Sequence, residues 1–105
     1  MKVSIILPIY NESDFIARTI DSIISQSYSQ NDMELIISDG MSNDDTRHIV
    51  KDYQSKFSFI KLIDNPERIV PTGFNRGLNV AKGKIIIRVD GHTTLDKNYI
   101  KNCVL

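Results

Sequence analysis

Four apolar runs of strand length recur along the chain, and each is followed by acidic or amide residues. The runs cover residues 3–9, 34–38, 59–63 and 84–89. Between them, apolar residues recur at three- and four-residue spacing, which predicts amphipathic helices. This alternation predicts an α/β fold with an open, mainly parallel sheet and helices on both faces. Right-handed crossovers would bring all the strand ends to one edge, so we expect that edge to be rich in oxygen ligands.

The first two helices are predicted from apolar stripes and capping residues. Residues 14–27 carry isoleucines on one face, with Asn11 or Ser13 as the expected cap. The next helix is expected to begin with a reciprocal pairing of Ser42 and Asp45, an aspartate version of the capping box. Its predicted buried face consists of Ile49, Val50, Tyr53 and Phe57.

Two further helices are predicted toward the end of the chain. Pro71 favours a first helical turn, and the helix is expected to end at Gly83. Its predicted inward residues are Phe74, Leu78 and Ala81. A last helix is expected from Leu95, with Asp96 as its cap. Its predicted face consists of Tyr99, Ile100, Cys103 and Val104. No stop residue follows it, so we expect a truncated domain.

The run at residues 84–89 ends on Asp90, Gly91 and His92. Its β-branched residues predict a buried strand, within which Arg88 would need a partner. Because open parallel sheets place their chemistry just past the carboxyl ends of strands, Asp90 and His92 are candidates for a metal or phosphate site. The alternative is a strand closed by an ordinary Asp-Gly turn.

Composition limits the possible function classes. The chain has 105 residues, of which 41% are apolar and 25% charged, which suits one domain or part of one. Thirteen basic residues balance thirteen acidic ones, which argues against bulk binding of nucleic acid or anionic membranes. The single cysteine, Cys103, fits a reducing compartment. No stretch approaches the roughly 20 apolar residues of a membrane span.

The residues after the first strand exclude two common nucleotide-binding motifs. Tyr10, Asn11, Glu12 and Ser13 follow it, with neither the glycines of a dinucleotide-binding turn nor a phosphate-binding P-loop. Carboxylates without a glycine cradle repel a bare diphosphate, so a phosphorylated ligand would need a divalent cation. Asp39 is able to accept a hydrogen bond from a base imide or a ribose hydroxyl. These features indicate a metal-bridged nucleotide.

Four motifs in order resemble the donor-binding half of family 2 glycosyltransferases over nearly the whole chain. They are Pro8-Ile9-Tyr10-Asn11-Glu12, the segment from Asp39 to Thr46, Asn75-Arg76-Gly77 with Ala81-Lys82-Gly83, and Asp90-Gly91-His92. The resemblance implies a GT-A fold, a nucleotide-sugar donor that we expect to be UDP-linked, Mg²⁺ or Mn²⁺, and transfer with inversion. It implies that residues 1–105 are the donor-binding half of the domain, without the acceptor half.

The resemblance also assigns site residues. By similarity, Pro8, Tyr10 and Glu12 line the nucleoside pocket, and Asp39 contacts the base. Asp90 belongs to the Asp-x-Asp motif that holds the metal and the diphosphate. The other donor-binding residues that we expect from the motifs are Arg68, Asn75, Gly77 and Gly91.

Two positions depart from the family pattern. The motif usually has an acid at its third position, where this chain has His92. Neutral imidazole suits Mn²⁺ better than Mg²⁺, so we expect His92 to join the metal site, with a simple turn as the alternative. Phe74 stands where a basic residue often precedes Asn75, and Arg68 or Arg76 are candidates for the missing charge.

The expected reaction lacks one participant in this chain. Family members use a carboxylate downstream of the donor motif to deprotonate the acceptor hydroxyl, so we expect the 105-residue chain to bind donor and transfer nothing. Relatives suggest polysaccharide or glycoconjugate synthesis in the cytoplasm, at the inner face of the membrane. Self-association through an unpaired sheet edge is also expected. The alternatives are a non-catalytic nucleotide-binding module and a metal-dependent nucleotidyltransferase.

Overall fold

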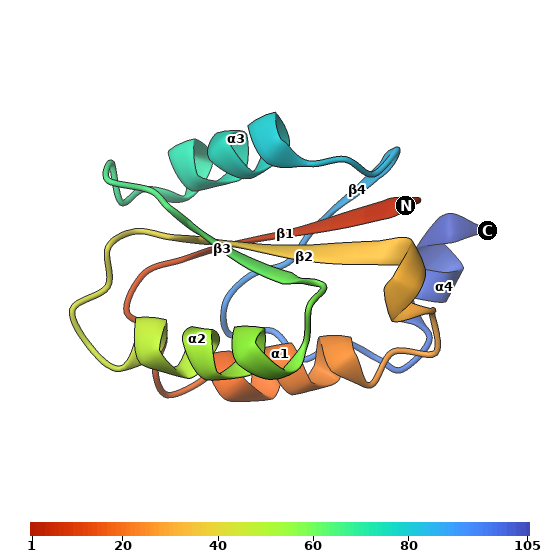
Figure 1. The fold of residues 1–105 in the computed structure, drawn as a ribbon, viewed down its shortest axis with the longest axis horizontal. Coiled ribbons are helices and arrows are strands. Elements are labelled where there is room, and N and C mark those ends of the chain that lie inside the picture. Colours follow the sequence, from red (N-terminus) through yellow and green to blue (C-terminus); the bar gives the residue numbers. More distant parts are fainter.

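The computed structural model describes residues 1–105, and it contains one four-stranded sheet with helices on both faces (Figure 1). The strands are β1 (Val3–Ile9), β2 (Met33–Asp39), β3 (Ile60–Asp64) and β4 (Ile85–Arg88). The helices are α1 (Ile16–Ile24), η1 (Gln30–Asp32, a 3₁₀ turn), α2 (Thr46–Lys56), α3 (Val70–Val80) and α4 (Tyr99–Val104). All strand pairs are parallel and the order is β3-β2-β1-β4. The predicted α/β fold is therefore confirmed.

The hydrophobic core lies between the sheet and helices α1 and α2, which cover the same face (Figure 1). Every residue of β1 and β2 is buried, which explains why these strands read as continuous apolar runs. The predicted stripe of α1 is confirmed by the buried side chains of Ile16, Ile20 and Ile23. On α2, Val50 is fully buried, and Ile49, Tyr53 and Phe57 pack against the core.

Helix α3 covers the opposite face, and it packs through glycines. Its buried residues are Gly73 and Gly77, whereas Leu78 is exposed and Phe74 is only partly buried. A Cβ atom at Gly77 would lie 2.5 Å from Ile6 Cγ2, so the absence of a side chain lets the helix lie close to β1. The predicted start at Pro71 is confirmed, but the predicted inward face and the end at Gly83 are wrong.

The prediction that residues 84–89 form a fully buried strand is also wrong. β4 lies at an edge of the sheet, and only Ile87 of its four residues is buried. The Arg88 side chain is 55% exposed, so it needs no buried partner. Its guanidinium lies 6.0 Å from the centroid of the Phe74 ring and 3.7 Å from Asp90 Oδ1. Composition alone did not reveal that β4 exposes alternate residues.

The predicted helix caps are replaced by contacts between loops. Neither α1 nor α2 has a side-chain cap on its own N-cap residue, which is Phe15 in α1 and Asp45 in α2. Instead, the Asp44 carboxylate accepts hydrogen bonds from the backbone amides of Thr46 and Ser13. Asp44 therefore ties the start of α2 to the loop before α1, a relationship that local sequence spacing does not contain.

The segment after β4 runs back along α1 instead of forming a long helix. Gln26 Nε2 donates to the Asp96 carbonyl at 2.6 Å, and Ile100 N donates to Gln26 Oε1 at 3.0 Å. The predicted start at Leu95 is therefore too early, because α4 begins at Tyr99. Ile100 is buried as expected, while Cys103 is exposed. No helix in the chain has the length and apolar character needed to span a membrane.

A buried carboxylate organises the amino ends of the strands. Glu34 has no exposed surface, and it accepts hydrogen bonds from Ser4 Oγ at 2.6 Å, Lys61 Nζ at 2.7 Å and the Lys82 amide at 2.7 Å. The Gly83 amide donates to Ser4 Oγ at 2.7 Å. This cluster fixes the turn between α3 and β4. The Ala-Lys-Gly motif at residues 81–83 therefore has a structural role at the amino ends of the strands, far from their carboxyl ends.

Candidate functional site

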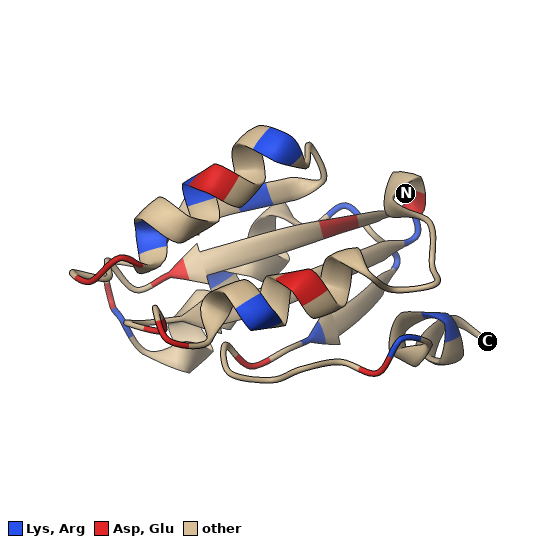
Figure 2. Ribbon diagram, turned by 90° about the horizontal axis from the view of Figure 1, so that it is seen from below, with Lys and Arg blue, Asp and Glu red and all other residues tan.

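The carboxyl ends of the strands meet at one edge of the sheet. Ile9 pairs with Asp39, and Asp39 pairs with Asp64, so β1, β2 and β3 end in register. β4 pairs with β1 through Arg88, which places Asp90 on the other side of β1. Acidic residues gather at this edge in the strand ends and the loops after them (Figure 2). The predicted convergence of oxygen-bearing residues is therefore confirmed.

Asp39 lies at the centre of this edge, and its side chain has no exposed surface. Arg47 donates through Nη1 to Asp39 Oδ2 at 2.8 Å and through Nη2 to Asp64 Oδ1 at 2.7 Å. The hydrogen bonds to Asp39 and to Asp64 raise the pKa of Arg47 above its ordinary value. The buried carboxylate of Asp39 is thus paired with a cation that also reaches the neighbouring strand.

The loops after β1 and β2 are joined through Asp39 and Ser42. The Ser42 amide donates to Asp39 Oδ2 at 2.9 Å, and its hydroxyl donates to Asp39 Oδ1 at 2.5 Å. The same hydroxyl accepts from the Asn11 amide at 2.8 Å. Asn11 and Asn43 exchange two further hydrogen bonds of 3.0 Å, so the two loops form one unit.

Tyr10 and Arg68 form the exposed part of the site between the loops after β1 and β3. The Arg68 guanidinium lies 5.8 Å from the centroid of the Tyr10 ring, within cation–π range. Gly40 lies beneath this pair, because a Cβ there would come within 3.1 Å of Arg68 Cα and 3.2 Å of Tyr10 Cδ1. The site therefore presents an aromatic ring beside a cation.

Backbone strain is concentrated at the same edge. The non-glycine residues with positive φ are Asn11 at 50°, Met41 at 62° and Arg68 at 68°. One lies in each of the loops after β1, β2 and β3. Left-handed conformations cost free energy in such residues, and they tend to occur at functional sites.

Asn65 shapes the loop that carries Arg68. It is buried, its amide donates to the Asp39 carbonyl at 2.7 Å, and its carbonyl accepts from the Arg68 amide at 3.1 Å. Its side chain donates to the Ile69 carbonyl at 3.0 Å and accepts from Thr72 Oγ1 at 3.1 Å. Asn65 thus connects the end of β2 to the loop that carries Arg68.

The end of β4 brings His92 against Glu12. His92 Nδ1 lies 3.1 Å from Glu12 Oε2, and the imidazole packs edge-on near Phe15 at 6.4 Å between ring centroids. A Cβ at Gly91 would lie 2.7 Å from Glu12 Oε2 and 2.7 Å from Ile9 Cγ2, so a larger residue would displace these side chains. Asp90 is 58% exposed, with Arg88 as a distant ion-pair partner at 3.7 Å.

The residues expected to bind metal do not form a closed site. No group of three or more His, Cys, Asp or Glu side chains is arranged to hold a metal ion. Mg²⁺ commonly takes one or two protein carboxylates and completes its shell with substrate phosphates and water. The exposed carboxylate of Asp90 fits that mode, and His92 Nε2 has no hydrogen-bond partner in the chain. The donor set therefore fits a cation that arrives with a diphosphate.

The remaining predicted site residues, Pro8, Asn75 and Gly77, differ in burial and in what they contact. Pro8 is buried in β1, under the first turn of α3, where a Cβ at Gly73 would lie 3.1 Å from Pro8 Cβ. Asn75 is exposed on α3 and lines a polar hollow with Glu67 and Arg76. Gly77 faces Ile6 of the sheet, so its contacts explain it by packing.

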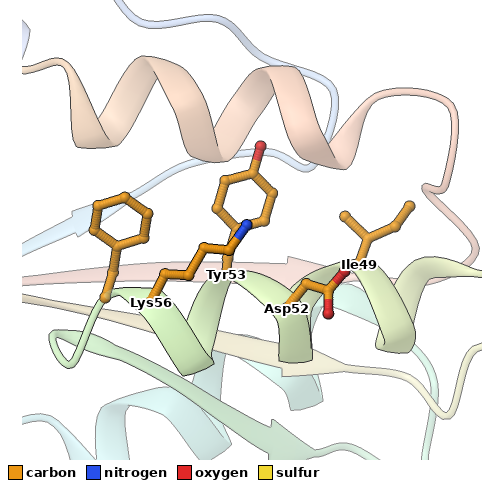
Figure 3. A pocket seen from close by; sticks show the side chains of 5 residues that line it. Ile49, Asp52, Tyr53 and Lys56 are labelled. Carbon is orange, nitrogen blue, oxygen red and sulfur yellow. The ribbon is translucent and has the colours of Figure 1, made fainter.

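Two further hollows differ in their chemistry. One lies beside Asp90 and is lined by Thr93, Thr94, Asp96 and Tyr99, among others. The other lies along the second half of α2, with Ile49, Asp52, Tyr53, Lys56 and Phe57 as its lining (Figure 3). Tyr53 points from it toward α1, where its hydroxyl donates to Asp21 at 2.6 Å. Of these two hollows, the one beside Asp90 adjoins the carboxyl end of β4.

Comparison with known proteins identifies the family. The model of glycosyl transferase family 2 matches residues 4–105. The chain belongs to this family. This family 2 chain is 32% identical over 102 residues to a protein from Methanococcus voltae. That relative is a dolichyl N-acetyl-alpha-D-glucosaminyl phosphate 3-beta-D-2,3-diacetamido-2,3-dideoxy-beta-D-glucuronosyltransferase. The alignment covers 95% of this chain and 32% of the relative.

Solved glycosyltransferases share the fold of this family 2 chain. S. aureus TarS (residues 1–349) in complex with UDP-GlcNAc has a TM-score of 0.85 at 26% identity, over 99% of this chain and 30% of that one. The mannosyltransferase PcManGT from Pyrobaculum calidifontis, in complex with GDP-Man and Mn²⁺, has a TM-score of 0.81 at 28% identity, over 87% of this chain and 27% of that one. The predicted GT-A glycosyltransferase fold is therefore confirmed. The chain spans about a third of the length of the Methanococcus voltae relative and of TarS 1–349.

Sequence reasoning missed the residues that hold the site together. Arg47 was not singled out, although a buried aspartate at a strand end requires a cation nearby. Asn65 is one of the amide residues that follow the apolar runs, and sequence alone does not reveal that its hydrogen bonds fix the next loop. The signal for Arg47 was its place in the first turn of the helix that follows Asp39. Its pairing with Asp64 depends on strand order, which a single sequence does not provide.

Proposed function

We propose that this chain binds the nucleoside diphosphate part of a sugar donor at the carboxyl edge of its sheet, with a uridine nucleotide as the first candidate. The observation that carries the proposal is the likeness to TarS, which was solved in complex with UDP-GlcNAc and matches 99% of this chain. The exposed pair of Tyr10 and Arg68 adds support, because an aromatic face beside a cation suits a base next to a phosphate.

The nucleoside end of the proposed site lies over β1 and β2. Tyr10 offers a stacking face, Pro8 and Glu12 flank the loop, and Asp39 is the proposed partner of a base imide. Because Asp39 has no exposed surface, a direct contact requires one of its present partners, Ser42 or Arg47, to shift when the nucleotide binds. Asp39 has a further role in every case, because it joins the loops that shape the pocket.

The diphosphate end of the proposed site lies between β1 and β4. Asp90 would hold Mg²⁺ or Mn²⁺, which supplies charge neutralisation to the departing diphosphate. His92 would add a ligand through Nε2, and Gly91 lets the loop approach Glu12. Arg68 would contribute a positive charge from the other side, and Asn75 on α3 would reach the donor from above the edge. Gly77 would act through packing.

We further propose that the full-length protein transfers the sugar to an acceptor hydroxyl with inversion. Residues 1–105 would form the donor-binding half of the domain and bind donor without transferring it. The base that deprotonates the acceptor and the acceptor site would come from the rest of the protein. Support comes from the Methanococcus voltae relative, whose name gives a dolichyl-phosphate-linked sugar as its acceptor. Synthesis of a polysaccharide or glycoconjugate in the cytoplasm, at the inner membrane face, agrees with an acceptor of that kind.

The experiment that tests this proposal is a donor screen with the full-length protein. UDP-, GDP- and ADP-linked sugars are offered with Mn²⁺ and an acceptor extract, and free nucleotide is measured. The proposal predicts nucleotide release that depends on the acceptor, with inverted anomeric configuration by NMR. Binding without turnover of any donor would favour the non-catalytic module, and transfer of a nucleotidyl group would favour the nucleotidyltransferase.

A further inference from the structure

Arg47 joins the ends of two strands with one planar group. Nη1 and Nη2 donate separately to Asp39 on β2 and Asp64 on β3, at 2.8 and 2.7 Å. Arg47 is 24% exposed while the Asp39 carboxylate is fully buried, so the guanidinium covers that carboxylate. A lysine has no fork and cannot make both contacts in this geometry.

One set of contacts links Asp39 to the loop after β1. The carboxylate of Asp39 holds Ser42 by both its amide and its hydroxyl. The hydroxyl of Ser42 then accepts from the Asn11 amide, next to Tyr10 in the chain. A displaced Asp39 would therefore move the loop that carries the Tyr10 ring.

A second set of contacts links Asp39 to the loop after β3. The Asp39 carbonyl accepts from the Asn65 amide, and the Asn65 carbonyl accepts from the Arg68 amide. Asp64, the other partner of Arg47, precedes Asn65 directly. Gly40 follows Asp39 and fills the space beneath Tyr10 and Arg68. Both sides of the exposed pair thus depend on the segment that Arg47 holds.

We infer that Arg47 is a positioning residue of the nucleotide site: its guanidinium fixes Asp39 and Asp64 so that Tyr10 and Arg68 meet over Gly40. The inference rests on the proposed function for its ligand, a nucleoside diphosphate. Arg47 acts through Tyr10 and Arg68, and it makes no hydrogen bond or ion pair with Asp90 or His92. Its loss should therefore weaken binding of the base more than binding of the diphosphate.

The test compares two probes in the full-length protein by calorimetry, UDP with Mn²⁺ and inorganic pyrophosphate with Mn²⁺. Arg47→Gln should weaken UDP binding about tenfold, since one charged hydrogen bond is worth about a factor of ten. It should weaken pyrophosphate binding less, since pyrophosphate loses only the charge of Arg68 and makes no contact with Tyr10 or Asp39. Arg47→Lys should recover part of the loss, because it keeps the charge. The control is Arg18→Gln, on an exposed position of α1, which should bind both probes like the wild type.

A second measurement tests the inference without any ligand. Hydrogen exchange of the free protein should be faster in Arg47→Gln than in the wild type at the amides of Asn11, Ser42 and Arg68, and unchanged in β1. If that variant does not fold, Asp64→Ala removes only the exposed contact and should show the same pattern more weakly. Equal weakening of both probes, unchanged UDP binding, or wild-type exchange in these loops would overturn the inference. A wild type that binds no nucleotide would overturn the proposed function instead, and the exchange pattern would still decide the role of Arg47.

Discussion

The guanidinium of Arg68 lies 5.8 Å from the centroid of the Tyr10 ring, and the two residues come from loops that follow β1 and β3. β2 lies between these strands, and Gly40 at its end leaves room for the contact. Arg68 takes a left-handed conformation, with φ of 68°, to reach it. The site therefore holds a strained residue against an exposed aromatic ring.

The first prediction concerns this pair. Tyr10→Ala should weaken UDP binding by about 1 to 3 kcal/mol, the range for loss of a base-stacking side chain. Arg68→Gly should also weaken UDP binding, yet change the free energy of unfolding by less than about 1 kcal/mol, because glycine relieves the positive φ. Calorimetry and urea unfolding measure the two effects. If both variants bind UDP as tightly as the wild type, Tyr10 and Arg68 are not part of the nucleotide site.

The second prediction concerns the buried carboxylate of Glu34. Burial raises the pKa of Glu34, but hydrogen bonds from Lys61, Ser4 and the Lys82 amide outweigh burial and lower it below the usual 4.5. Glu34→Gln should therefore reduce the free energy of unfolding by about 1 to 3 kcal/mol at pH 7. Glu67→Gln, at an exposed pair with Arg76, should cost less than about 1 kcal/mol.

The pH dependence of the Glu34 effect follows from the sign of its pKa shift. A lowered pKa in the folded state gives stability that is complete above about 4.5 and is lost as pH falls through the folded value. The difference between the wild type and Glu34→Gln should thus shrink in acid. A difference that grows below pH 4.5 would contradict the assignment of the cluster.

The third prediction compares two serines on the same face of neighbouring strands, both without exposed surface. Ser4 Oγ donates to Glu34 and accepts from the Gly83 amide, whereas Ser38 Oγ has no hydrogen-bond partner. Ser4→Ala should destabilise by about 1 to 3 kcal/mol, and Ser38→Ala should be neutral or stabilising. Chemical unfolding of both variants measures this difference. Equal costs would mean that Ser38 has a partner after all.

The fourth prediction separates packing from binding at Gly77. Gly77→Ala should destabilise by about 1 to 3 kcal/mol, because its Cβ would lie 2.5 Å from Ile6 Cγ2. Ile6→Ala alone should cost about 2 to 5 kcal/mol, because Ile6 is fully buried, but in that background Gly77→Ala should cost less than in the wild type, because the shorter side chain leaves room for the Cβ. Thermal unfolding gives the stabilities, and the double variant should bind UDP like Ile6→Ala alone. Weaker UDP binding in the double variant would place Gly77 in the donor site.

The sequence predicted what depends on local pattern, and it missed what depends on neighbouring strands. The isoleucines of α1 and the continuous apolar run of β1 follow from periodicity and burial, and both were confirmed. β4 has the same composition as a central strand but lies at an edge, because strand order is a property of the whole sheet. Ser42 and Asp45 were expected to cap the second helix, whereas Asp44 binds the amide of Thr46 and also the Ser13 amide of another loop.

The same distinction applies to the site. Asp39 and Asp90 were found because each follows an apolar run directly. The surroundings of these two residues could not be predicted from the sequence. Arg47 and Ser42 enclose Asp39, while Asp90 is exposed to solvent. His92 was expected at a metal, and the structure pairs its Nδ1 with Glu12 from a loop 80 residues away. Such partners are set by tertiary contacts.

The central claim is that the carboxyl edge binds a nucleoside diphosphate together with a divalent cation. Its most direct test is calorimetric titration of the protein with UDP, with and without Mn²⁺, for the wild type and Asp90→Asn. The account predicts that Mn²⁺ strengthens UDP binding in the wild type and that most of this gain is lost in Asp90→Asn, while binding of uridine alone is unchanged. The central claim would be contradicted if UDP binding did not depend on Mn²⁺, or if Mn²⁺ strengthened UDP binding as much in Asp90→Asn as in the wild type.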